Sequence, residues 1–177
     1  MFDFIKPIAD WQTIARELNG EFKNGSILTP ARLKIPYGQN TYHIETGFSG
    51  DNFWRAKTII HCEFLYFKQF ELEIYKNLLT NNNQEYQFRI GLTSGFEELG
   101  ERIQDLPILK ELAKYFDNYR LIFKTEGVIK ENYDVLPILQ FKTDGYIRSK
   151  DKFEIIFKCM QDISNELLKD EIIKSSI

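Results

Sequence analysis

The sequence is poor in residues that build disulfide frameworks, and it has no apolar run long enough to cross a membrane. Among its 177 residues are two cysteines, Cys62 and Cys159, which are too few for a disulfide framework and show no CxxC spacing. The start, MFDFIKPIADW, carries acidic Asp3 and lacks the continuous apolar segment that a signal peptide needs. We therefore expect a cytoplasmic protein without a membrane partner.

Concentrated charge of one sign is missing as well. The chain has 23 basic and 26 acidic residues, a formal net charge of -3, and no long run of like charges. The nearest approach to a basic cluster is one C-terminal segment with Arg148, Lys150, Lys152 and Lys158. Acidic residues interrupt it at Asp144, Asp151 and Glu154. Because nucleic-acid binding depends on concentrated lysine and arginine, we expect no nucleic-acid partner.

Motifs of the common nucleotide-binding and catalytic sites are absent. No GxGxxG or GK[ST] segment follows a predicted strand, and no GxSxG elbow occurs. The sequence therefore favours a non-catalytic protein and leaves catalysis open only where its two histidines lie.

Apolar side chains, by contrast, are plentiful. Hydrophobic residues make up 43% of the chain and aromatic residues 15%. A chain of this length forms one domain and buries roughly two-thirds of the surface that it exposes when unfolded. Its core therefore needs no disulfide, metal or cofactor for stability.

Hydrophobic periodicity near 3.6 predicts four helices, at residues 7–19, 96–104, 106–116 and 149–169. Pro7 suits a first helical turn, and Asn19 with the following glycine supplies a stop. Asp105 is the expected N-cap of the third helix. In the last helix, Cys159 is expected at the edge of the apolar stripe.

A period near two predicts strands elsewhere. Between residues 25 and 75, short β-branched and aromatic runs predict an antiparallel meander of three or four strands, in which each strand borders its neighbour in sequence. A short strand is expected at 86–90, within a polar stretch at 79–95 that we predict to be a mobile loop. IFKTEGVIK at 122–130 and QFKTDGYIR at 140–148 align as two similar strand-and-turn units.

One histidine stands next to a cysteine, in the segment IIHCEF at 59–64. Adjacent residues of a strand point to opposite faces, so His61 and Cys62 cannot act together. We predict that Cys62 lies in the core, with a raised pKa and little reactivity.

Both histidines are followed two residues later by a glutamate, in the segments HIE and HCE. Residues two apart on a strand share a face, and we expect the two segments to pair as antiparallel strands. One register places His43 opposite His61. The other places His43 opposite Glu63 and Glu45 opposite His61. Either register gathers two imidazoles and two carboxylates on one face.

Another carboxylate joins this cluster if segment 70–75 pairs with the other side of 58–66, because Glu73 then lies opposite His61. Two neutral imidazoles with carboxylates can bind Zn, Mn or Fe, and a carboxylate beside a histidine prepares it for acid–base chemistry. The same pattern is also explained by cross-strand pairs worth about 0.2–1 kcal/mol each, which need no ligand. The candidate ligand- or metal-binding residues are His43, Glu45, His61, Glu63 and Glu73.

Several aromatic residues gather near the ends of predicted strands: Tyr37, Tyr42, Phe48, Phe53 and Trp54. They either pack in the core or line a groove for a ligand or a partner peptide.

Three segments, WQTIARELNGEF at 11–22, IPY at 35–37 and GYIRSKDKFEIIFKCMQDI at 145–163, together resemble a loose family of uncharacterised bacterial cytoplasmic proteins. Its members begin with a helix and strand of the pattern W-x-x-[IL]-A-x-E-[LI]-x-G-x-F, and they end in a strand and a helix. The resemblance spans most of the chain. It implies an α+β fold and carries over no activity.

These patterns predict one α+β domain over residues 1–177. We expect a mainly antiparallel sheet of roughly five to seven strands, with the N-terminal, central and C-terminal helices packed mostly on one face. The leading functional hypothesis is a non-catalytic binding or protein-interaction domain without a cofactor, acting on a protein partner or as a homodimer. The alternative is a metal-binding protein, or a metal-dependent or acid–base enzyme, centred on the His/Glu cluster.

Overall fold

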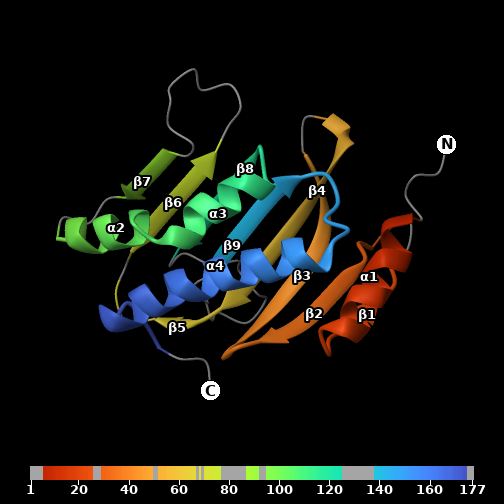
Figure 1. The fold of residues 1–177 in the computed structure, drawn as a ribbon, viewed down its shortest axis with the longest axis horizontal. Helices are drawn as coiled ribbons and strands as arrows, with labels where there is room; N and C mark the ends of the chain where they lie inside the picture. Colours follow the sequence, from red (N-terminus) through yellow and green to blue (C-terminus); the bar gives the residue numbers. More distant parts are fainter. Residues whose placement is uncertain are drawn as a thin grey trace.

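The computed structural model describes residues 6–25, 29–49, 52–66, 68, 70–76, 87–91, 95–124 and 138–174. This part of the chain forms an eight-stranded antiparallel sheet with helices packed on one face, as Figure 1 shows. The predicted single α+β domain is confirmed, with one more strand in the main sheet than expected. In chain order the elements are α1 (Lys6–Glu17), β1 (Glu21–Lys23), β2 (Arg32–Tyr37), β3 (Asn40–Ser49), β4 (Asn52–Glu63), β5 (Leu65–Tyr66), β6 (Glu71–Lys76), β7 (Gln87–Gly91), α2 (Glu97–Gln104), α3 (Pro107–Tyr115), β8 (Tyr119–Lys124), β9 (Ile138–Asp144), α4 (Lys150–Lys169) and β10 (Ile173–Lys174).

The strand order in the sheet is β1-β2-β3-β4-β9-β8-β6-β7. Strands β2, β3 and β4 form part of the meander predicted for residues 25–75, and β1, which precedes that range, pairs with β2. Beyond β4, the prediction that sequence neighbours lie side by side is wrong, because β9 pairs with β4 and β8 lies between β9 and β6. A separate two-stranded sheet joins β5 to β10. The centre of the main sheet is thus made of strands that are far apart in sequence.

Local signals explain where the helices begin and end. Helix α1 ends as predicted, since Asn19 adopts a left-handed φ of 53° and the N–H of Gly20 donates to the carbonyl of Ala15 at 2.7 Å. Helix α3 begins with Pro107, but its N-cap is Leu106. The prediction of Asp105 as that cap is wrong, because the α2 helix runs so close to α3 that Asp105 serves as the C-cap of α2.

Helix α4 lies in front of the sheet along most of its width (Figure 1). It starts after Ser149, with Asp151 in its first turn and Lys169 in its last, which suits the helix dipole. Cys159, predicted at the edge of the apolar stripe, is fully buried. Within the described part of the chain, no helix is both long and apolar enough to cross a membrane.

The core lies between the helices and the inner face of the sheet. Tyr42 of β3 stacks on Phe157 of α4 with ring centroids 4.6 Å apart, and Phe116, just after α3, meets Phe141 of β9 edge to face at 5.3 Å. Trp11 of α1 donates from Nε1 to the carbonyl of Ile147 at 2.8 Å. These contacts attach α1, α3 and α4 to the same side of the sheet and leave the other side to the outward-pointing residues of the strands.

Two other predicted features are described only in part. The strand expected at 86–90 is present as β7, whereas most of the predicted mobile loop at 79–95 lies outside the described residues. The second strand-and-turn unit is present as β9, followed by Gly145 with a left-handed φ of 78°. The first unit contributes the end of β8, and its turn lies outside the described residues.

Candidate functional site

Side-chain alternation gives the sheet an outer face, which we define as the face opposite the helices. Along β2, Arg32 and Lys34 are exposed while Leu33 and Ile35 are buried. Strands β6 and β9 alternate in the same way, with their outward residues half-buried. The outward set is polar and charged, and it includes half-buried isoleucines. None of the four described helices packs on this face.

The two histidines meet on the outer face. His43 of β3 lies directly opposite His61 of β4, and their rings stack with centroids 5.4 Å apart and planes inclined by 17°. Of the two registers that the sequence left open, the structure has the His43–His61 pairing. Both side chains are half-buried.

A hollow of about 740 Å³ surrounds the histidine pair. Its volume lies in the range of ligand-binding pockets, roughly 300–1,000 Å³. Its outward-pointing lining residues are strand residues from β1, β2, β3, β4 and β9: Glu21, Lys23, Arg32, Lys34, His43, Glu45, His61, Glu63, Ile138 and Gln140. The hollow therefore offers cations, carboxylates, an amide and an apolar side chain on a rigid sheet.

Both predicted glutamates next to the histidines are in this hollow. Glu45 lies opposite Ile59 rather than a histidine, and its Oε2 is 3.8 Å from Nε of Arg32. Glu63 lies opposite Ile138 of β9. Among the described residues, no group of three or more histidine, cysteine, aspartate or glutamate side chains is arranged to hold a metal ion.

Glu73 does not join the cluster. It lies on the outer face of β6, and two strands, β9 and β8, separate β6 from the strand that carries His61. At about 4.8 Å per strand the separation is roughly 14 Å. Glu73 instead accepts a hydrogen bond from Nε of Arg120 at 2.5 Å. The predicted pairing of 70–75 with 58–66 is wrong because the hairpin between them does not form.

Cys62 faces the core, as predicted. Its exposure is 1%, and burial raises the pKa of its thiol far above the ordinary value. The side chain points to the opposite side of β4 from His61, so the two cannot cooperate. The thiol is part of the core packing.

The predicted aromatic groove is not supported where the structure describes it. Tyr42 is buried, and burial raises the pKa of its hydroxyl well above the ordinary value. Tyr37 is half-buried and packs against Phe157 with centroids 5.5 Å apart. The side chains of Phe48, Phe53 and Trp54 lie outside the described residues.

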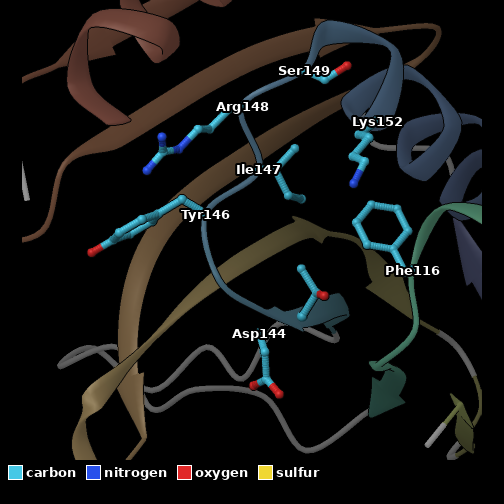
Figure 2. Close-up of a pocket in the computed structure, with 8 residues that line it drawn as sticks. Phe116, Asp144, Tyr146, Ile147, Arg148, Ser149 and Lys152 are labelled. Atoms are coloured by element: carbon cyan, nitrogen blue, oxygen red, sulfur yellow. The ribbon is translucent and has the colours of Figure 1, made fainter. Parts of the chain in front are cut away.

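A second hollow, of about 270 Å³, lies where the chain leaves β9 and enters α4. Figure 2 shows Lys152 and Phe116 together on one side of this segment, while Arg148 and Tyr146 extend to the other side. Nζ of Lys152 is 5.3 Å from the centroid of the Phe116 ring. Burial raises the pKa of Tyr146, and the nearby Arg148 lowers it in part. The two cations do not converge on one point, so this hollow offers no single anion site.

Sequence reasoning missed several lining residues of the first hollow. Arg32 and Lys34 were assigned to a strand, but the face of the sheet to which they point was not predicted. Ile138 and Gln140 were not expected to lie near the histidines. Alternation within β2 could have placed the first two on the side of the histidines. The other two depend on the β4–β9 pairing, for which the sequence holds no local signal.

Comparison with known protein families, with curated proteins and with solved structures finds no match to this chain.

Proposed function

We propose that this chain is a non-catalytic binding protein that contacts a protein partner through the outer face of its sheet. The observation that carries the proposal is the outer face itself, which has a hollow of about 740 Å³ and a half-buried histidine pair and which none of the described helices covers. The described helices pack on the opposite face of the sheet.

The chemistry of this face is that of a protein interface. Stable interfaces combine an apolar centre with a polar rim, and arginine and aromatic rings are frequent in them. Here Ile59 and Ile138, both half-buried, lie among the outward residues of the central strands. Charged residues occupy the strands on either side, with Arg32 on β2 and Glu73 on β6.

Site-specific photo-crosslinking in the organism's own cells tests the proposal. A photoreactive amino acid placed at His61 should form a covalent adduct with a protein. The matched control places the same amino acid at Lys158, an exposed residue on α4, on the helical side of the domain. Absence of an adduct at His61, or equal yields at both positions, would contradict the proposal.

A divalent metal bound by the two imidazoles is the second candidate, and the opposed pair His43–His61 favours it. Two histidines would supply two ligands, with Glu45, Glu63 or water completing the coordination. Calorimetric titration with Zn²⁺ tests this function. Binding that His43→Ala and His61→Ala each abolish supports it, and binding that survives both substitutions rules this pair out.

A further inference from the structure

Outward-pointing residues line up in rows across the sheet, because all the strand registers are fixed. One row runs through six strands in the order Lys34, His43, His61, Gln140, Ile122 and Glu73. The next row runs Arg32, Glu45, Ile59, Lys142, Arg120 and Tyr75. Four strands lie on each side of the boundary between β4 and β9.

At two pairs of equivalent positions, the charges on the two sides of that boundary are opposite in sign. Lys34 on β2 corresponds to Glu73 on β6, and both strands are third from the boundary. Glu45 on β3 corresponds to Arg120 on β8, and both strands are second from it. Each side also has its own ion pair, Arg32–Glu45 and Arg120–Glu73. If a second copy of the sheet is rotated by 180° about an axis parallel to the strands and placed against the first, these positive positions face negative ones.

We propose that the partner is a second copy of this chain, packed outer face to outer face about a two-fold axis that runs along the boundary between β4 and β9. This inference rests on the proposed function of the outer face. In this arrangement Lys34 faces Glu73 of the partner subunit, and Glu45 faces Arg120 of the partner subunit. A two-fold interface makes each contact twice, so four charge pairs form.

At the centre of the same arrangement, polar and apolar side chains of one copy lie opposite side chains of the partner subunit that suit them. β4 lies over β9 of the partner subunit, which sets His61 against Gln140 of the partner subunit and Glu63 beside Ile138 of the partner subunit. The imidazole and the amide can exchange a hydrogen bond. Ile59 is covered by the aliphatic part of Lys142 of the partner subunit.

The area of the outer face fits a stable dimer. Eight strands about 4.8 Å apart, with about six residues of roughly 3.3 Å each, give about 760 Å² per copy. Specific interfaces bury about 800 Å² per partner, and packed sheets align their strands to within about 30°. The outer face is therefore large enough without any further segment of the chain.

Charge exchange between copies tests the inference. Analytical ultracentrifugation should find the native chain at twice its 21.0 kDa mass. Lys34→Glu sets a glutamate against Glu73 of the partner subunit in both copies of the contact, and Glu73→Lys sets a lysine against Lys34 of the partner subunit in both. Each variant alone should dissociate about tenfold or more readily, because like charges then face each other.

An equimolar mixture of the two variants should restore the dimer. In the mixed pair, both contacts again join a lysine to a glutamate. Restoration cannot arise within one chain, because five strand spacings of about 4.8 Å separate β2 from β6. It also demonstrates that both variants are folded. Lys158→Glu and Glu101→Lys are the matched controls, since both are exposed helical positions and their net charge changes are the same.

A native chain that sediments as a monomer, or a mixture that stays monomeric, would overturn the inference. The crosslinking experiment separates this failure from failure of the proposed function. An adduct at His61 of twice the chain mass supports self-association. An adduct with a different protein leaves the outer face as an interaction surface and makes the dimer wrong.

Discussion

Thr58 holds the segment that leads from β9 into α4. The side chain is fully buried in β4, and its Oγ1 donates to the carbonyl of Gly145 at 2.8 Å and accepts from the N–H of Ile147 at 3.1 Å. The N–H of Gly145 donates in turn to the carbonyl of Ala56 at 2.7 Å. The left-handed Gly145 and the segment that leads into α4 are thus fixed to β4 through this hydroxyl and one backbone hydrogen bond.

Thr58→Val keeps the shape of the side chain and removes both of its hydrogen bonds. Gly145 is exposed, so its carbonyl can turn to water at a cost of about 1 kcal/mol for the lost bond. Ile147 is buried, and its N–H loses this acceptor, which costs about 1–3 kcal/mol. The added methyl group returns about 0.8 kcal/mol. We expect the free energy of unfolding to fall by about 2 kcal/mol, or the melting temperature by roughly 4–8 °C for a chain of this size.

Urea unfolding followed by tryptophan fluorescence, together with scanning calorimetry, measures this loss. Thr46→Val is the matched control, because Thr46 lies directly opposite Thr58 in β3 but is only half-buried, so its hydroxyl has access to water. The control should change stability by less than about 0.5 kcal/mol. If Thr58→Val has no larger effect than Thr46→Val, the proposed role of this hydroxyl is refuted.

Three further outcomes are expected. Hydrogen bonds from Lys169 and Arg102 hold the pKa of buried Glu166 below its ordinary value of 4.5. The ionised carboxylate therefore stabilises the fold above about pH 4.5, and this stabilisation is lost as the pH falls. In urea titrations at several pH values, Glu166→Gln should flatten the acid side of the stability profile. Burial raises the pKa of both cysteine thiols, so a thiol reagent should label them in denaturant and leave the native protein unlabelled. Gly38→Ala should cost about 1–2 kcal/mol in the same urea assay, because Gly38 has a φ of 60°.

Local features of the fold could be predicted from the sequence because their signals lie within a few residues. Asn19 and the glycine after it mark the end of α1, and the apolar stripe after Ser149 marks α4. The turn between β3 and β4 restricts the pairing of their histidines to two registers. The choice between these registers depends on how the whole hairpin packs, and the structure has His43 opposite His61.

The sequence predicted only some of the residues of the candidate site. Alternation along β3 and β4 places His43, Glu45, His61 and Glu63 on one face, and all four line one hollow. Glu73 was placed in the cluster on the assumption that strands close in sequence are neighbours. Two other lining residues, Ile138 and Gln140, come from β9, about eighty residues along the chain, and they were not foreseen.

The sequence by itself determined the four helices and most of the strands of the main sheet, the alternation of side chains along β3 and β4, and the place of Cys62 in the core. These follow from periodicity, which is a property of neighbouring residues. Only the tertiary structure decided that β9 and β8 separate β4 from β6. As a result, Lys34 and Glu73 lie on the same face, at equal distances on the two sides of the boundary between β4 and β9. Strand order depends on which apolar surfaces the helices cover together, and that competition involves the whole chain at once.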